Sequence, residues 1–258
     1  MSLVYVYAIA RADGAQPGGL QGMDDAAVRR ERAGELAAFV SDVSEAEFAE
    51  IPLNANLSDM TWLAPRAVRH QEVNAALAAA VDPLVPLSFG TVFRDREGVE
   101  RMLRERAAEI GPRLDALRGK AEWIAVVRRD EQSARAALET ASEPLRALRA
   151  QIGAAAPGRA YLVTRRLDET MRQELRSSDA GAVAATVETL EAAGGRLFRE
   201  PLIEDAGVGM IARFSVLADR RDGAALGRAE IAGWSDRGYR LELTGPWPAY
   251  RFATVTAE

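Results

Sequence analysis

The segment Leu241-Glu242-Leu243-Thr244-Gly245-Pro246-Trp247-Pro248-Ala249-Tyr250-Arg251-Phe252 is the most informative stretch of the chain. Its first residues continue an alternation that starts at Tyr239, with an apolar side chain at every second position. This period is typical of a strand with one buried face. We expect the strand to stop at Gly245, because glycine permits a sharp turn and the two prolines that follow each remove a backbone donor.

Three aromatic residues then lie on a short arm that the prolines stiffen: Trp247, Tyr250 and Phe252. Two interpretations of this arm stay open. In the first, the arm packs back onto its own domain. In the second, it docks onto a partner, because tryptophan and tyrosine are enriched among the residues that dominate binding energy.

A second distinctive segment is Pro83-Leu84-Val85-Pro86-Leu87-Ser88-Phe89-Gly90-Thr91-Val92-Phe93. Residues 84–93 are predicted to form a strand that turns at Ser88-Phe89-Gly90. This block and the arm resemble, in order, the PLxFGTVF block and the C-terminal signature of the gas vesicle accessory proteins GvpF and GvpL. The arm of that family commonly reads GPWPPY, and alanine stands here at position 249. Three weaker matches follow the order of the family: Val4 to Ile9, Ala121-Glu122-Trp123-Ile124 and Gly158-Arg159-Ala160-Tyr161-Leu162.

Composition limits the classes of protein that this chain can represent. Its 258 residues have room for one large domain or two of about 100 to 130 residues. A net charge of −5 argues against a nucleic-acid partner. The absence of cysteine and the single histidine exclude disulfides, thiolate sites and multi-histidine metal sites. The opening apolar run is too short for a signal peptide or a membrane span, so we expect a soluble cytoplasmic protein with no membrane partner.

The first half of the chain reads as strands and helices in the order β-β-α-β-α-β. Pro83 is predicted to end the first helix, which carries His70, Val73, Leu77 and Val81, and Gly111-Pro112 to kink or end the second. Residues 24–35 could add a short helix. We expect a compact α+β sandwich with helices on one face of a largely antiparallel sheet, and ferredoxin-like character is possible. The predicted strands are 4–9, 36–43, 84–93 and 123–127.

The second half is predicted to be α+β as well. Residues 130–152 are helical with an interruption at Pro144, and 153–158 form a linker. A long helical stretch, 160–193, could break in two at 177–181. Strands follow at 210–217 and 239–244, with a short helix at 219–234 between them.

Two α+β domains are therefore expected, and the resemblance implies the same. The predicted boundaries are residues 1–130 for the first domain, 131–158 for a connecting helix and linker, 159–245 for the second domain and 246–258 for the aromatic arm.

The search for catalytic chemistry is negative. An unperturbed histidine titrates near neutrality, which makes His70 the obvious general-base candidate, but it lies in register with apolar residues and no nucleophile motif accompanies it. We expect it to be half-buried and hydrogen-bonded to a neighbouring backbone group or carboxylate rather than catalytic. No phosphate loop and no metal-loop spacing of acidic residues occur. The sequence predicts a protein that is not an enzyme and has no cofactor and no metal.

The resemblance implies an accessory or minor structural protein in gas vesicle assembly, located at the gas vesicle and in the cytoplasm. Its expected partners are the small hydrophobic shell protein and other gas vesicle accessory proteins. The alternative is a two-domain regulatory protein that binds a small molecule. The residues that we expect to define the structure or contact the partner are Leu87, Phe89, Gly90, Phe93, Gly245, Pro246, Trp247, Pro248, Tyr250 and Phe252.

Overall fold

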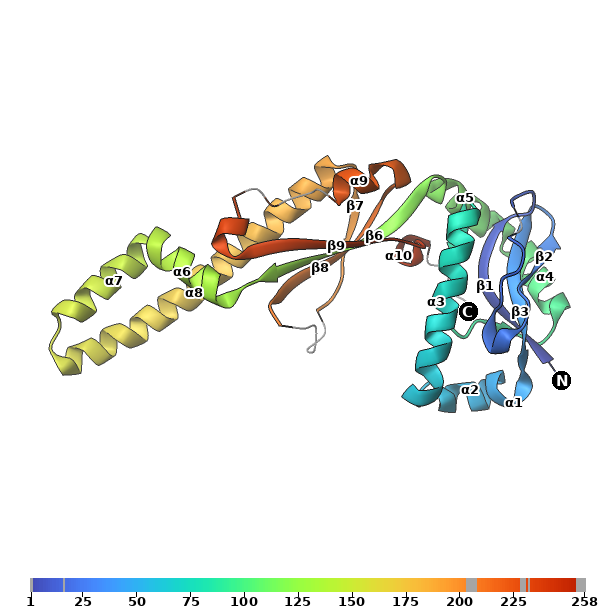
Figure 1. The fold of residues 1–258 in the computed structure, drawn as a ribbon, viewed down its shortest axis with the longest axis horizontal. Coiled ribbons are helices and arrows are strands. Elements are labelled where there is room, and N and C mark those ends of the chain that lie inside the picture. The colour runs from blue at the N-terminus through green and yellow to red at the C-terminus, as the bar shows by residue number, and fades with distance from the viewer. Residues whose placement is uncertain (1, 16, 203–207, 228–230, 232, 254–258) are drawn as a thin grey trace. The chain divides into compact units, whose positions relative to one another are not determined.

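The computed structural model describes residues 2–15, 17–202, 208–227, 231 and 233–253 (Figure 1). The chain forms two compact units. The first comprises Met1–Glu122 together with Pro246–Glu258, and the second comprises Trp123–Gly245. The domain boundaries at 130, 158 and 245 stay a prediction.

The first unit is built on a sheet with the strand order β2-β3-β1-β4, and β5 also pairs with β1. All of these pairs are antiparallel. The central strand carries a β-bulge between Val6 and Ala8, which switches the side of the sheet that alternate residues face. The strands are β1 (Ser2–Arg11), β2 (Arg29–Ala33), β3 (Leu36–Ser44), β4 (Leu84–Pro86) and β5 (Val92–Phe93).

Helices cover both faces of this sheet, whereas the sequence predicted helices on one face. Every residue of β1 from Val4 to Ala10 is buried, which needs cover on each side. α3 packs with Tyr5 and Tyr7 on one face, and α4 and α5 bring buried leucines and isoleucine against β2, β3 and β4. The helices are the single turn η1 (Met23–Asp25), α1 (Glu45–Phe48), α2 (Glu50–Asn56), α3 (Met60–Ala80), α4 (Arg96–Glu105), α5 (Ala107–Leu117) and α10 (Tyr250–Ala253).

The second unit holds a four-stranded sheet in the order β7-β8-β6-β9. A core cluster joins α6, α7, α8 and β9 through residues such as Leu145, Met171 and Tyr239. With a sheet and helices in each unit, the predicted α+β class is confirmed. The elements are β6 (Lys120–Arg129), α6 (Glu131–Ala141), α7 (Glu143–Ala154), α8 (Pro157–Ala192), β7 (Arg196–Arg199), β8 (Met210–Asp219), η2 (Arg220–Asp222), α9 (Gly223–Leu226), η3 (Ser235–Arg237) and β9 (Tyr239–Trp247).

The long helix α8 runs without interruption through the predicted break at 177–181. Asp179 accepts hydrogen bonds from Arg129 of β6 and from the Tyr239 hydroxyl of β9, at 2.6 and 2.9 Å. Gly181 lets the Trp234 ring lie against the helix, since a Cβ there would come within 2.5 Å of Trp234 Cη2. The glycine therefore provides space for a ring rather than a break in the helix.

Two predicted features of the first unit are wrong. Residues 24–35 form η1 and the strand β2, because Asp24 and Asp25 have positive φ angles of 50° and 57° that no α-helix permits. The second predicted helix is interrupted at Arg106, and Gly111 and Pro112 lie inside α5. Pro112 cannot donate to the carbonyl of Ala108, and a proline distorts the helix on its N-terminal side. The interruption at Arg106 lies on that side, within two turns of Pro112.

The C-terminal half departs from prediction at three places. The linker predicted at 153–158 is occupied by the end of α7, a two-residue connection and the start of α8. The helix expected at 219–234 is reduced to η2 and α9, and residues 228–230 and 232 lie outside the described residues. β9 continues through Gly245 and Pro246 to Trp247. β9 is an edge strand, and edge strands are the places in a sheet where proline is tolerated.

The space at Gly181 gives a prediction for stability. Gly181→Ala should lower the free energy of unfolding by about 1–3 kcal/mol, because the overpacking against Trp234 outweighs the gain in helix propensity. Gly153→Ala in α7 is the matched control, since nothing lies within 4 Å of a Cβ at that position. Thermal unfolding of both variants measures the difference. A higher melting temperature for Gly181→Ala would contradict the packing of Trp234 on α8.

Candidate functional site

Leu87 and Phe89, two of the residues selected from the sequence, lie inside the first unit beside β1. The backbone N–H of Leu87 donates to the Tyr7 carbonyl at 2.8 Å, and the Leu87 side chain is buried. The Phe89 ring lies 6.0 Å from the Tyr5 ring and 5.7 Å from the His70 ring. Both residues therefore hold the connection between β4 and β5 against the core.

Gly90 and Phe93, the other two residues of that block, line an open groove of about 480 Å³. Gly90 has a φ of 83°, and its N–H donates to the Tyr5 hydroxyl at 3.1 Å. One wall of the groove comes from α1 and α2, and the other from residues 90–94. Its apolar lining consists of Leu3, Phe48, Ala49, Leu53, Val92 and Phe93, and its polar groups come from Glu45, Glu50, Asn54 and Arg94.

The C-terminal arm packs onto the first unit. Pro248, Ala249 and Ala253 are buried. The Tyr250 hydroxyl accepts from Asn74 Nδ2 at 2.9 Å and donates to Gln71 Oε1 at 3.0 Å, and both partners belong to α3. Beyond Tyr250, the N–H of Arg251 donates to Glu122, and Phe252 is half-buried.

The remaining arm residues are more exposed. Gly245 and Pro246 lie in the exposed end of β9, and Trp247 keeps 44% of its surface exposed. The arm is thus anchored by its tyrosine and leaves its tryptophan open to solvent.

His70 is the point at which the two selected segments meet. Its ring contacts Phe89 and lies 6.3 Å from the Tyr250 ring. Asn74 Nδ2 lies 3.0 Å from His70 Nε2, and an amide nitrogen can only donate. Neutral His70 therefore accepts at Nε2 and carries its proton on Nδ1, which lies 2.9 Å from the Tyr5 hydroxyl.

The surroundings of His70 disfavour its charged form. Burial lowers the pKa of His70 from 6.5 to about 4, although the Leu87 backbone acts in the opposite direction. A proton on Nε2 would also face the donor group of Asn74. Burial likewise raises the pKa of Tyr250 to about 12. The sequence correctly predicted a hydrogen-bonded histidine, but His70 is fully buried rather than half-buried, and its side-chain partners are the Tyr5 hydroxyl and the Asn74 amide rather than a carboxylate.

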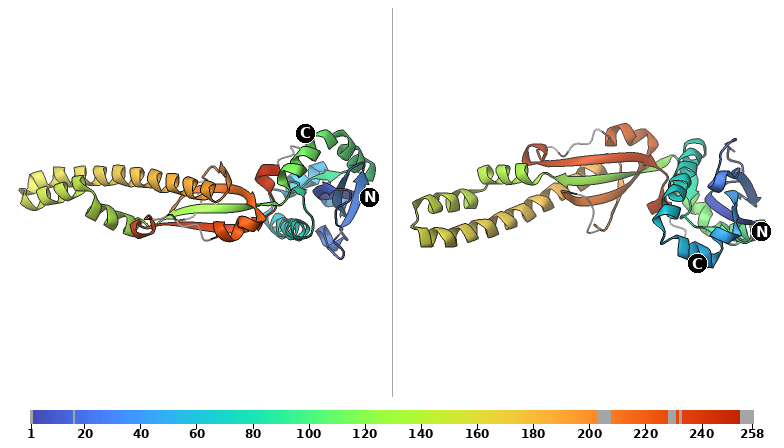
Figure 2. Two further views of the ribbon diagram at one scale, coloured as in Figure 1. Left: turned by 90° about the horizontal axis from the view of Figure 1, so that it is seen from above. Right: turned by 60° about the horizontal axis from the view of Figure 1, so that its bottom comes forward.

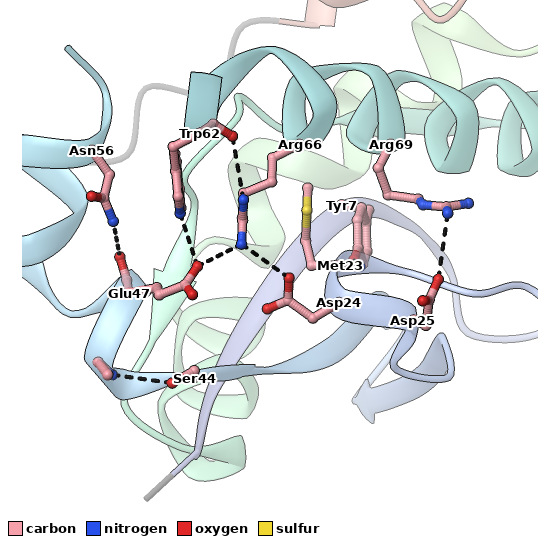
Figure 3. Close-up of polar contacts among 11 residues, drawn as sticks. Tyr7, Met23, Asp24, Asp25, Ser44, Glu47, Asn56, Trp62, Arg66 and Arg69 are labelled. Carbon is pink, nitrogen blue, oxygen red and sulfur yellow. Dashed lines mark hydrogen bonds and ion pairs between the residues drawn. The ribbon is translucent and has the colours of Figure 1, made fainter. Parts of the chain in front are cut away.

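A polar network joins α1 and α2 to α3 (Figure 3). Arg66 donates to Glu47 Oε2 at 2.6 Å, and the Trp62 indole N–H donates to the same oxygen at 2.8 Å. The Arg66 guanidinium also lies over the Trp62 ring, 4.4 Å from its centroid. Asn56 of α2 donates to the Glu47 carbonyl at 3.2 Å. Because Glu47 precedes Phe48, these contacts hold the α1 wall of the groove in place.

The same network reaches the strained turn η1. Asp24 and Asp25 lie 3.4 Å from Arg66 and Arg69, respectively. The N–H of Met23 donates to the Tyr7 hydroxyl at 2.7 Å. These contacts supply the constraint that two consecutive residues with positive φ require.

Sequence reasoning did not select the residues that support the groove and the arm. Asn74 had a visible signal, since a polar residue stood beside Val73 on the apolar stripe of a helix. Glu47, Arg66 and Gln71 had none, because ion pairs and amide contacts between distant residues leave no periodic pattern.

Within the residues that the structure describes, no group of three or more histidine, cysteine, aspartate or glutamate side chains could hold a metal ion. None of the helices in that part of the chain is both long enough and apolar enough to span a membrane.

The buried histidine predicts a pH dependence of stability. The folded-state pKa lies below the unfolded value, so His70 favours folding above about pH 6.5 and this contribution is lost as the pH falls toward 4. Between about pH 7 and pH 5 the loss is about 2 kcal/mol. Urea unfolding of His70→Gln should show a pH dependence that is weaker by this amount. Identical pH dependence in the two proteins would contradict a depressed pKa.

Tyr250→Phe should lower the free energy of unfolding by about 1–2 kcal/mol, because the bonds to Asn74 and Gln71 are lost and Asn74 is buried. Tyr161→Phe is the matched control, since Tyr161 is 65% exposed. Chemical unfolding of both variants tests the anchor. Equal stability of the two variants would show that the Tyr250 hydroxyl does not hold the arm.

Comparison with known proteins agrees with this architecture. Residues 3–254 match the family model described as gas vesicle synthesis protein GvpL/GvpF. The chain is 34% identical to gas vesicle protein L of Streptomyces sp. (strain CB03234), over 99% of this chain and 94% of that protein. It is 27% identical to gas vesicle protein L2 of Halobacterium salinarum (strain ATCC 700922 / JCM 11081 / NRC-1), over 96% of this chain and 90% of that protein.

Two crystal structures have the same fold. GvpF from Anabaena sp. PCC7120 superposes with a TM-score of 0.72 at 16% identity, over 100% of this chain and 98% of that chain. GvpF from Microcystis aeruginosa superposes with a TM-score of 0.67 at 19% identity, over 98% and 99%. The family match over nearly the whole chain confirms the resemblance seen in the sequence: the chain belongs to the GvpL/GvpF family of gas vesicle synthesis proteins and is involved in gas vesicle formation.

Proposed function

We propose that this protein is a non-enzymatic accessory component of gas vesicle assembly that binds the small hydrophobic shell protein at the groove of the first unit. The observation that carries the proposal is the groove between α1, α2 and residues 90–94, whose lining combines six apolar side chains with four polar ones. Two residues selected from the sequence, Gly90 and Phe93, lie in this lining. The proposed location is the gas vesicle and the cytoplasm.

A groove of this kind suits the proposed partner, because the small shell protein is hydrophobic. A shell subunit with one strongly apolar face self-associates when it is free, because burial of apolar surface drives aggregation. An accessory protein that covers part of that face keeps the subunit available for the growing shell. A groove that combines apolar and polar side chains fits the insertion of an amphipathic segment, whose apolar residues would lie against Phe48, Leu53 and Phe93.

The groove is supported in a way that suits binding. The Glu47 contacts with Arg66 and Trp62 fix one wall, and the bond from Gly90 to Tyr5 fixes the other. A wall that is ordered before binding loses little conformational freedom on binding, which favours affinity. The exposed Trp247 of the arm is the second candidate contact, because a tryptophan on a stiff segment is a typical anchor.

Co-purification with the tagged small shell protein tests this proposal. Phe93→Ala removes a ring from the groove, and Asn54→Trp fills the groove from an exposed position of α2. Each should weaken retention by about 30-fold or more, as expected for loss of a binding hot spot. Trp247→Ala tests the arm, and point substitution leaves the Tyr250 anchor intact. Val208→Ala is the control, since Val208 is 99% exposed and lies outside the groove.

The outcomes separate the parts of the proposal. Loss with both groove variants, at unchanged melting temperature, supports the groove as the contact. Loss with Trp247→Ala alone moves the contact to the arm. Retention by all variants moves it elsewhere, and failure of the unaltered chain to retain the shell protein refutes direct binding.

A further inference from the structure

The first half of α8 and the whole of α7 form a helical hairpin that extends away from the sheet of their own unit (Figures 1 and 2). α7 packs against α8 and α6. The seam between the two helices contains Leu145, Leu148 and Met171, all of which are buried. Since the hairpin is only two helices thick, the opposite side of α8 is left open to solvent.

Five residues between Arg159 and Arg166 lie on that open side. At 100° per residue, these five fall within an arc of about 160° of the helix surface. Tyr161 and Leu162, which are neighbours in the sequence, are 65% and 64% exposed, so two large apolar side chains face solvent together. We call this surface the α8 face, and it consists of Arg159, Tyr161, Leu162, Arg165 and Arg166.

The α8 face is strongly basic. Residues 144–167 contain five arginines and no acidic residue, although the whole chain has a net charge of −5. Arg146 and Arg149 pair with Glu143 and Glu139. In the described part of the chain, Arg159, Arg165 and Arg166 have no ion pair. The face thus combines unpaired cations with an exposed aromatic ring, a composition enriched at protein interfaces.

A surface of opposite character lies in the first unit. Residues 34–65 contain six acidic residues and no basic one. Ile51, Leu57 and Met60, which are 84%, 40% and 67% exposed, lie where α2 meets α3. Glu50 and Asp59 flank them with exposed carboxylates. We call this set the α2–α3 corner.

Arginines of the same unit already offset some of the acidic charge in residues 34–65. Asp42 pairs with Arg29, and Glu47 pairs with Arg66. Glu50 and Asp59 form no ion pair among the described residues. The uncompensated carboxylates are thus those beside the exposed apolar side chains.

We propose that the α8 face of one copy of this protein docks on the α2–α3 corner of a second copy. Tyr161 and Leu162 would cover the apolar side chains of the corner, while the arginines lie against Glu50 and Asp59. The two surfaces are different, so the contact is heterologous and repeats from copy to copy into a ring or an open chain. This self-association does not depend on binding of the shell protein.

The contact is expected to be weak and sensitive to salt. Each surface is defined by only five residues, whereas a standard stable interface has about 20–30 residues on each side. Attraction between exposed charges falls as the Debye length shrinks from about 10 Å at 0.1 M salt to about 3 Å at 1 M.

Sedimentation velocity of the purified full chain, over a range of concentrations at low and high salt, tests the proposal. Arg165→Glu with Arg166→Glu should raise the dissociation constant by about tenfold or more, as should Glu50→Arg with Ser58→Arg on the corner. The control is Arg172→Glu with Arg176→Glu, which makes the same charge change further along α8, outside the basic stretch. Its dissociation constant should stay close to that of the unaltered chain.

The decisive step is to mix the two double variants. Each alone should be monomeric, and the mixture should associate again because the charges are exchanged between the surfaces. A chain that is monomeric at all concentrations overturns the proposal, as does association that the α8 variant leaves unchanged, or a mixture that stays monomeric. Binding of the α8 face to anionic phosphatidylserine vesicles without self-association would assign the face to a membrane surface and would also overturn it.

Discussion

The first unit depends on satisfying two tyrosine hydroxyls that are buried on its central strand. Tyr5 and Tyr7 are fully buried, and a buried hydroxyl without a partner costs about 1–3 kcal/mol. The Tyr5 hydroxyl hydrogen-bonds with His70 and accepts from the Gly90 N–H. The Tyr7 hydroxyl hydrogen-bonds with the Ser41 hydroxyl and accepts from the Met23 N–H. Each hydroxyl thus fixes a connecting segment, and Tyr5 also fixes α3.

These bonds lead from the core to the proposed binding surface. The Gly90 bond sets one wall of the groove, while Trp62 and Arg66 on α3 hold Glu47 and with it the other wall. His70 continues the chain of contacts through Asn74 to Tyr250, so the same helix that supports the groove anchors the C-terminal arm. One helix, α3, therefore holds both the α1 wall of the groove and the Tyr250 anchor of the arm, and a surface that is ordered before binding favours affinity.

Local patterns predicted much of the fold. Three predictions were correct: the strand at 4–9, the helix that ends before Pro83 and the interruption at Pro144. Each rests on a signal that acts over a few residues, namely alternation, an apolar stripe or a proline. β2 was missed because this edge strand, whose sequence is Arg29-Arg30-Glu31-Arg32-Ala33, shows no apolar alternation. The possible break in α8 at 177–181 does not occur. Gly181 provides space for the ring of Trp234, which is far away in the sequence. For the candidate site, the sequence selected the two segments but not the α3 residues that join them.

The sequence by itself determined the α+β class, the family and the two segments that meet at His70, since these follow from local periodicity and from motifs. Only the tertiary structure decided that helices cover both faces of the first sheet, that Phe89 packs against the core while Phe93 lines a groove, and that Tyr250 is an anchor while Trp247 is exposed. The physical reason is the same in each case. Burial and hydrogen bonding of a side chain depend on partners distant in sequence, such as Asn74 for Tyr250, and local composition does not specify them.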